Sequence, residues 1–318
     1  MLKIVHGEEK HWQKIEKVLA RVWGEDDYVA HSWLHNLQNP EAMLTIVALW
    51  DDTPVGTCNI ALREDASAWF HAMRIDPDYQ GRGISGEMTR FALDEVAKRG
   101  IKRCLAAIDG DNIASQKSAA RAGFERVYVY EALVPSSRSE IDIDDAASDA
   151  ALWCEVSLCE AGEYLEMALP YLNYPRDNMM IGWELISPKL EVLVDSLCWE
   201  SWHDDSEQAG DSIAEGASSE CSDEEEGKRC FFQGWKKDAA RAYAAIYAFD
   251  EEAVVMSPVC SDIIAWHEAL NALERVMQKE NKLFCIWLTP DDPLYEATLQ
   301  VGYSLKEENS YQIWQLLI

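Results

Sequence analysis

Apolar residues recur along the first 135 residues with two different periods, and each period predicts one kind of element. Short apolar runs predict β-strands at residues 1–6, 42–50, 54–64, 68–75, 102–108 and 126–134. Runs whose apolar residues return every three or four positions predict helices at residues 11–23, 28–37, 84–98 and 113–122. Strands and helices that alternate in this way predict an α/β domain.

The remainder of the chain is predicted to be a linker and a second domain. Residues 136–150 are polar and rich in serine and aspartate, which predicts a linker between residues 1–135 and a domain at residues 151–318. Inside that second domain, about residues 203–229 are rich in acids. Such a segment cannot bury enough apolar surface to offset the entropy of ordering it, so we predict a disordered insertion.

One order of elements occurs twice. After Pro77 come a helix, a strand and an Ala-Gly-Phe turn at Gly123, and after Pro258 come a helix, a strand and a Val-Gly-Tyr turn at Gly302. The nearly equal spacing predicts two copies of one fold. The second copy has Val-Cys-Ser-Asp-Ile-Ile where the first has a glycine loop, so we predict that it does not hold the anion of the first.

The glycine loop of the first copy reads Gln-Gly-Arg-Gly-Ile-Ser-Gly and precedes the helix at residues 84–98. Glycines accept a positive φ and allow close approach to the backbone, and the first N–H groups of a helix favour an anion. The loop therefore predicts a diphosphate site. It is not a P-loop, since Gly-Lys-Ser/Thr is absent. Gly81, Gly83 and Gly86 have the spacing of a dinucleotide-binding loop, but at least three strands and two helices precede them.

Composition narrows the class of protein and its partners. The net charge of −29 argues against nucleic acid as a partner and favours cationic partners such as amines. Nine cysteines without a Cys-x-x-Cys pair indicate reduced thiols rather than a zinc ribbon or a disulfide framework. The first residues do not resemble a signal peptide, and no apolar run reaches the roughly 20 residues that span a bilayer. We therefore expect a cytoplasmic protein without a membrane partner or a metal.

The loop and its flanks resemble motif A of the GNAT superfamily of acetyl-CoA-dependent N-acetyltransferases, whose loop reads Gln/Arg-x-x-Gly-x-Gly/Ala. Gln80 and Gly83 match this motif, and Ser85 departs conservatively at the last small position. A downstream segment resembles the family's Asn-x-x-Ala/Ser…Gly-Phe pattern through four residues: Asn112, Ser115, Gly123 and Phe124. The resemblance covers about residues 1–135. It implies tandem GNAT-like domains, each with a mixed, mostly antiparallel sheet flanked by helices, of which the second is degenerate.

The same resemblance implies a binding site for acetyl-CoA as co-substrate. The loop backbone would hold the pyrophosphate, the preceding strand would pair with the pantetheine arm, and an N–H group near Met73 would polarise the thioester carbonyl. The implied coenzyme-binding residues are Met73, Ile75, Gln80, Gly81, Arg82, Gly83, Ile84, Ser85, Gly86, Asn112 and Ser115.

Acetyl transfer to an amine needs a base that takes the proton of the nitrogen. The family often has a glutamate on the strand before the loop. Here His71 takes that position, and histidine with its reference pKa near 6.5 suits the task. Glu64 is the reserve base, and the alternative for His71 is mere packing. The family's tyrosine, seven residues after the asparagine, is Ala119 here. Tyr128 is therefore the candidate acid, with Tyr130 or bulk water as alternatives.

The predicted acceptor site lies over the first two helices. His71 is expected to face it, with Phe70 and Ala72 on the other face of the strand, because strand neighbours alternate. Asp27 and Tyr28 would meet a cationic group of the substrate; the alternative is a solvated helix cap beside core aromatics. This segment has a loose similarity to histidine N-acetyltransferase-like proteins, which favours a small amine or an amino acid as acceptor.

The activity implied by the resemblance is transfer of acetyl to a primary amine of a small molecule or amino acid, by direct attack in a ternary complex. Two alternatives stay open. One is a protein acetyltransferase that acts on an N-terminus or a lysine. The other is a coenzyme A-binding regulator without turnover, which the missing tyrosine at Ala119 supports.

Overall fold

The structure is a computed structural model and describes residues 1–24, 27–63, 65–136, 153–155, 179–181, 184–186, 229–237, 240–248, 252–279 and 283–318. The predicted linker and the predicted acidic insertion lie, apart from one end residue each, outside the described residues, and so does Glu64. The chain forms two compact units, which we describe separately: residues 1–129 with 308–318, and residues 130–307.

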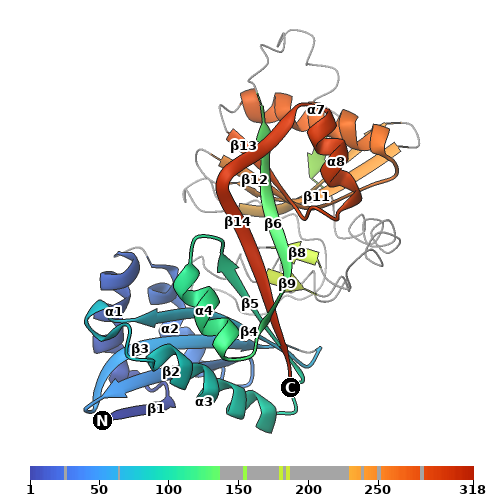
Figure 1. The fold of residues 1–318 in the computed structure, drawn as a ribbon. Helices are drawn as coiled ribbons and strands as arrows, with labels where there is room; N and C mark the ends of the chain where they lie inside the picture. The colour runs from blue at the N-terminus through green and yellow to red at the C-terminus, as the bar shows by residue number, and fades with distance from the viewer. Residues whose placement is uncertain are drawn as a thin grey trace, which may run out of the picture. The chain divides into compact units, whose positions relative to one another are not determined.

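The first unit is an α/β layer structure (Figure 1). Its elements are β1 (Leu2–His6), η1 (Glu9–His11), α1 (Trp12–Trp23), α2 (Tyr28–Gln38), β2 (Met43–Trp50), β3 (Thr53–Leu62), β4 (Ser67–Ile75), η2 (Pro77–Tyr79), α3 (Ile84–Lys98), β5 (Arg103–Asp109) and α4 (Ile113–Arg121). The strand order is β1-β2-β3-β4-β5-β14, where β14 is Tyr303–Leu317. Only β4 and β5 among these neighbours run parallel. The predicted mixed, mostly antiparallel sheet is confirmed.

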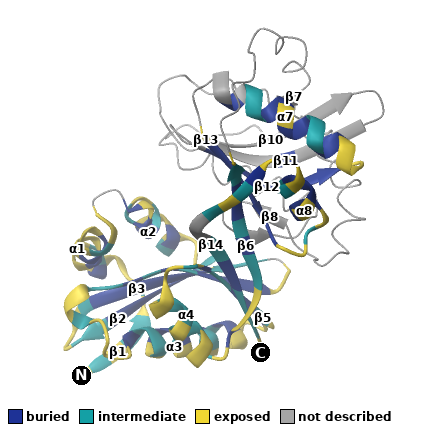
Figure 2. Ribbon diagram, turned by 45° about the horizontal axis from the view of Figure 1, so that its top comes forward, coloured by how far each residue is buried: buried dark blue, intermediate teal, exposed yellow. Residues whose placement is uncertain are grey.

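Helices cover both faces of this sheet because each helix buries one apolar stripe. On one face, Ile84, Met88 and Ala92 of α3 pack into a core with Ile46 and Ile60 of the sheet. The other face has a core of its own, whose buried residues are Ile15, Leu19, Val29, Trp33, Val47 and Ala72. This second core lies under α1 and α2, whose outer sides are exposed (Figure 2).

Two strands take places that the sequence analysis did not predict. Residues 311–317 of β14 pair with residues 109–103 of β5 and so join the first unit. Residues 131–133 of β6 (Glu125–Pro135) pair with residues 288–286 of β13 (Leu283–Leu288) in the second unit. Gly110 keeps β14 close to the end of β5, since a Cβ at this position would collide with Ser310. An apolar pattern shows that a segment is a strand, but not which sheet it joins.

The second unit repeats the element order of the first. Its strand order is β6-β13-β12-β11-β10-β7, from β7 (Trp153–Glu155), β10 (Arg229–Lys237), β11 (Ala240–Ala248) and β12 (Glu252–Cys260). β8 (Met179–Ile181) and β9 (Glu184–Ile186) form a separate pair, and α7 (Ile263–Lys279) and α8 (Pro293–Gln300) pack on the main sheet. β12 runs parallel to β13, as β4 does to β5. The predicted second copy of the fold is confirmed.

Candidate acetyl-CoA and acceptor site

A β-bulge interrupts β4 in its middle. The register between β3 and β4 shifts so that Ala72 and Met73 together lie opposite Cys58. Ala72 has a φ of +56°, and the extra residue turns its side chain to the face of α1 and α2. Burial raises the pKa of the Cys58 thiol to about 12, so this thiol stays protonated and donates a hydrogen bond to the His71 carbonyl oxygen at 3.5 Å.

The bulge corrects one detail of the sequence analysis. Phe70 packs in the core under α3, whereas Ala72 packs in the core under α1 and α2, so these two residues do not share a face. Simple alternation failed because the bulge inserts one residue into β4. His71 precedes the bulge and follows Phe70, so it lies on the face of α1 and α2 as expected, where it is half-buried.

β4 and β5 separate next to this bulge. Their parallel pairing begins at Ser67 and ends with the pair Phe70 and Ala106, although β4 continues to Ile75. Within the described part of the chain, β3 is therefore the one strand neighbour of β4 beyond Phe70. Backbone N–H and C=O groups along this edge are available to an extended ligand, as in the addition of a strand to a sheet. Met73 and Ile75, both predicted to bind the coenzyme, lie on this segment.

The glycine loop follows β4 and leads into α3. Gly81 and Gly83 have φ values of +74° and +78°, which glycine adopts without strain. A Cβ at either of them, or at Gly86, would meet nothing within 4 Å. Gly83 is the N-cap of α3 and offers no side chain, so the first N–H groups of this 15-residue helix lack a side-chain acceptor. Ile84 is buried under the helix and anchors it. The loop thus fits a diphosphate.

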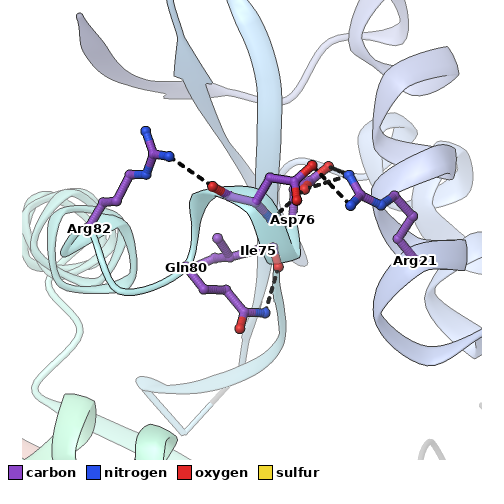
Figure 3. Close-up of polar contacts among 6 residues, drawn as sticks. Arg21, Ile75, Asp76, Gln80 and Arg82 are labelled. Carbon is purple, nitrogen blue, oxygen red and sulfur yellow. Dashed lines mark hydrogen bonds and ion pairs between the residues drawn. The ribbon is translucent and has the colours of Figure 1, made fainter.

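Gln80 fixes the loop to the strand. Its Nε2 donates a hydrogen bond of 3.0 Å to the carbonyl oxygen of Ile75, the last residue of β4 (Figure 3). The predicted contact of Gln80 with the coenzyme stays a prediction. The observed bond gives the side chain a second task, which is to hold the turn that presents the loop backbone.

Arg82 keeps a positive charge at the loop. Its guanidinium donates to the Asp78 carbonyl oxygen at 2.9 Å (Figure 3). The same group lies 5.2 Å from the ring centre of Trp50 and 5.1 Å from that of Tyr79, which is cation–π range. A cation held in this way beside the uncapped helix favours a bound phosphate.

A third contact ties this turn to α1. Arg21 of α1 contacts Asp76 at 2.7 Å and Asp78 at 3.0 Å (Figure 3). Asp76 also caps η2, because its carboxylate accepts a hydrogen bond from the N–H group of Asp78 at 3.0 Å. Both carboxylates are therefore committed to the turn rather than to a ligand.

The second motif meets the first at one edge of the sheet. Because β4 and β5 are parallel neighbours, α3 and α4 begin at the same edge, and Ser118 of α4 donates to Ser85 of α3 at 3.0 Å. Asn112 is the N-cap of α4, and its Oδ1 accepts from the Ser115 N–H at 3.0 Å. Asn112 and Ser115 thus lie near the opening between β4 and β5, although the Oδ1 of Asn112 is already engaged.

Asp27, predicted to meet a cationic group of the substrate, is buried within the fold. Its side chain is 0% exposed, caps α2 by accepting from the Val29 N–H, and pairs with the guanidinium of Arg74 through contacts of 2.9 and 3.2 Å. The sequence pattern alone does not mark Arg74 as a partner of Asp27, because the two residues lie far apart along the chain. The carboxylate is neutralised within the fold, so Asp27 does not offer a charge to a substrate. Tyr28 is 49% exposed and lies 5.8 Å from the Arg74 guanidinium.

Asp27→Ala is expected to lower the free energy of unfolding by about 3 kcal/mol, because it leaves the buried Arg74 guanidinium without its carboxylate. Asp78→Ala is the matched control. It removes a carboxylate from an exposed ion pair with Arg21, and such pairs contribute about 0–1 kcal/mol. Urea denaturation of both variants measures the difference. Equal losses in the two variants would contradict a structural role for Asp27.

Tyr128, the candidate acid, lies half-buried on β6, whereas Tyr130 is buried. The roles of Tyr128 as acid and of His71 as base stay predictions.

In the described ranges no group of three or more His, Cys, Asp or Glu side chains could hold a metal ion. The helices of the same ranges include none that is long and apolar enough to cross a membrane.

The second unit keeps the bulged strand but has a different loop. Ser257 has a φ of +46°, and the pairing of β12 with β13 ends at Met256, the residue directly before Ser257. The helix that follows is capped by a carboxylate: Oδ1 of Asp262 accepts from the Ala265 N–H at 2.8 Å. A negative charge thus lies where the first unit offers free N–H groups, and it would repel a phosphate.

We therefore expect one acetyl-CoA per chain. Isothermal titration calorimetry of the full chain should give a stoichiometry near one, with the binding site in the first unit. A stoichiometry of two would contradict our inference that the carboxylate of Asp262 keeps a phosphate away from the second unit.

The first unit thus combines a mixed sheet, whose parallel strands β4 and β5 separate after Phe70, with a helix that begins at Gly83. Residues 10–124 match the acetyltransferase (GNAT) family. The chain therefore carries a GNAT N-acetyltransferase domain, as the motifs predicted. No match was found among curated proteins.

Solved structures resemble the whole chain in fold. A GCN5-related N-acetyltransferase from Kribbella flavida is 15% identical with a TM-score of 0.60, and the match covers 100% of this chain and 71% of that one. A GCN5-related N-acetyltransferase from Anabaena variabilis is 11% identical with a TM-score of 0.61, and the match covers 100% of this chain and 73% of that one. A tandem GNAT protein from the clavulanic acid biosynthesis pathway is 14% identical with a TM-score of 0.63, and the match covers 100% of this chain and 98% of that one. At these identities the likeness concerns the fold alone, and it confirms the predicted tandem arrangement.

Proposed function

We propose that this protein transfers the acetyl group of acetyl-CoA to a primary amine of a small molecule or amino acid, by direct attack in a ternary complex. The observation that carries the proposal is the opening between β4 and β5, which begins at His71 and lies beside the uncapped start of α3. One edge of this opening offers backbone groups to an extended ligand, and its end offers N–H groups to an anion.

Acetyl-CoA supplies the acetyl group as a reactive thioester. Backbone N–H groups of Gly81 to Gly86 hold the diphosphate in this proposal, with Arg82 nearby as a cation. The free edge of β4 pairs with the pantetheine arm and thereby orients the thioester. The N–H group of Met73, the second residue of the bulge, donates to the carbonyl oxygen, on which negative charge develops.

His71 takes the proton of the acceptor nitrogen as that nitrogen forms its bond to the acetyl carbon. The carbon–sulfur bond breaks, and the coenzyme A thiolate receives a proton from Tyr128 or from water. His71 returns its proton to solvent. Its position beside the opening, on the face covered by α1 and α2, supports this role and favours turnover over a purely regulatory protein.

The charge of the chain supports a cationic acceptor. A net charge of −29 attracts amines and raises their concentration at the surface. Asp27 is excluded as the residue that contacts the acceptor, because Arg74 occupies its carboxylate. Tyr28 stays a candidate because its ring is exposed at the start of α2.

Release of coenzyme A with a panel of acceptors tests the proposal. The panel contains small primary amines, amino acids, and peptides with a free N-terminus or an internal lysine. Release with small amines supports the proposed function, whereas release with peptides alone would support a protein acetyltransferase. Tight binding of acetyl-CoA without release by any acceptor would instead favour the regulator.

A further inference from the structure

The bulge of β4 is held by side chains on both sides of its strained residue. Ala72 has a φ of +56°, a backbone conformation that persists in such a residue only where its surroundings fix it. Before Ala72, the carbonyl oxygen of His71 accepts a hydrogen bond from the Cys58 thiol at 3.5 Å. After it, the carbonyl oxygen of Met73 accepts one from the guanidinium of Arg74 at 3.4 Å.

Arg74 is itself fixed by its surroundings. Its guanidinium donates to both carboxylate oxygens of Asp27, at 2.9 and 3.2 Å, and Asp27 in turn accepts from the Val29 N–H at the start of α2. The ring centre of Trp23, at the end of α1, lies 4.9 Å from the guanidinium, and that of Tyr28 lies 5.8 Å from it. The side chain of Arg74 is 9% exposed. A planar group held on all these sides keeps the backbone next to Met73 in one position.

The second unit has the same bulge without a guanidinium. The register between β11 and β12 shifts so that Ser257 and Pro258 lie opposite one residue of β11, and Ser257 has a φ of +46°. Pro258 therefore takes the place of Met73. The next residue, Val259, takes the place of Arg74. Since this bulge forms beside an uncharged valine, the ion pair of the first unit serves a purpose other than forming the bulge.

The energetics of buried ion pairs agree with this conclusion. Replacing both partners of such a pair by apolar residues is often neutral for stability, so a buried pair is weak evidence for a stabilising role. Two features differ together between the bulges: Pro258 has no backbone N–H to offer, whereas Met73 has one, and only the Met73 bulge has an arginine beside it. The unit whose loop fits a diphosphate thus has both the N–H group and the guanidinium.

We propose that Arg74, held by Asp27, is a positioning residue that aims the N–H group of Met73 at the carbonyl oxygen of the thioester. This inference rests on the proposed function, in which that N–H group donates to the carbonyl. Arg74 acts indirectly, because its bond to the Met73 carbonyl oxygen and its anchor on Asp27 limit rotation of the backbone at Met73. A donor that is aligned before the reaction stabilises the developing charge without reorganisation.

The first test removes the pair without leaving a buried charge. Asp27→Ser combined with Arg74→Leu keeps a side-chain cap on α2 and replaces the guanidinium by an apolar group. We expect kcat per folded molecule to fall about 10–100-fold, the cost of a misplaced catalytic group, with an unchanged Kd for coenzyme A. The matched control is Asp65→Ser combined with Arg103→Leu, which removes a 2.8 Å ion pair next to the start of β4 and should keep kcat.

The second measurement observes the N–H group itself in the full chain labelled with ¹⁵N-methionine. The Met73 amide signal, assigned by its loss in Met73→Leu, should be single in the wild type and should move further with acetyl-CoA than with coenzyme A, which lacks the carbonyl. In the double variant it should split or broaden, because the peptide group takes more than one orientation. If the double variant does not fold, Arg74→Lys provides both measurements, since its ammonium keeps the charge but lacks the planar fork.

Met73→Pro removes the donor, and Pro258 shows that such a bulge accommodates proline. This variant should lower kcat about 10²–10³-fold, the usual effect of losing one oxyanion donor. A Met73 signal as sharp as in the wild type together with unchanged kcat in the folded double variant, or normal kcat in Met73→Pro, would overturn the proposal. A wild type that acetylates no acceptor would refute the proposed function instead, and the Met73 signal would then decide the positioning role by itself.

Discussion

Gly83→Glu is expected to weaken acetyl-CoA binding at least about 1,000-fold, which corresponds to roughly 4 kcal/mol. Gly83 is the N-cap of α3, no side chain caps this helix start, and a Cβ at Gly83 would meet nothing within 4 Å. Glutamate adds both bulk and a negative charge at this point, so it competes with the phosphates for the same N–H groups. Calorimetric titration of the folded variant with acetyl-CoA measures the effect.

Gly100→Glu is the matched control for this substitution. Gly100 lies beyond the other end of α3, has a φ of +77° close to the +78° of Gly83, and also has open space around a Cβ. Both variants therefore introduce the same charge and a similar backbone strain, about 1–2 kcal/mol for a left-handed conformation. The control should bind acetyl-CoA normally. Equal affinities in the two variants would show that the diphosphate does not lie at Gly83.

His71→Ala should lower kcat about 10²–10⁴-fold, the usual cost of losing a general base. This equals roughly 3–5 kcal/mol of barrier. The Kd for acetyl-CoA should change little, because the loop and the free edge of β4 stay intact. In the wild type, kcat/KM should fall at acidic pH as the base becomes protonated, and this acidic limb should disappear in the variant.

The control for His71→Ala is His6→Ala. His6 lies on β1, its exposed side chain contacts Glu95 at 3.4 Å, and it has no place in the proposed chemistry. Turnover per folded molecule across pH 5.5 to 9 separates the two readings of His71. An unchanged kcat and pH profile in His71→Ala, with a loss of stability, would mean that the histidine only packs in the sheet.

The sequence was sufficient for those parts of the structure that depend on local patterns. The predicted helix at residues 84–98 agrees with α3 to the residue, because Gly83 and Gly100 mark its two ends. The repeat predicted β12, α7 and β13 from the first copy. Motifs with positive-φ glycines were also readable, since few other residues adopt such a backbone.

Features that depend on long-range contacts could not be predicted in this way. The bulge at Ala72 leaves no mark in the alternation of apolar residues, because the strand on both sides of it looks regular. Asp27 resembled an exposed acid at a helix start, and only the fold shows that Arg74, far along the chain, takes its carboxylate.

The position of β14 in the first sheet has a consequence for folding during synthesis on the ribosome. Domains of a growing chain often fold in order, the N-terminal one first. Here β5, at residues 103–109, pairs with residues 311–317, which are synthesised long afterwards. Until then, one edge of β5 stays open, and open edges invite pairing with other chains. The catalytic half therefore matures last, so a ribosome that stalls inside the second half would release a chain without a complete first sheet.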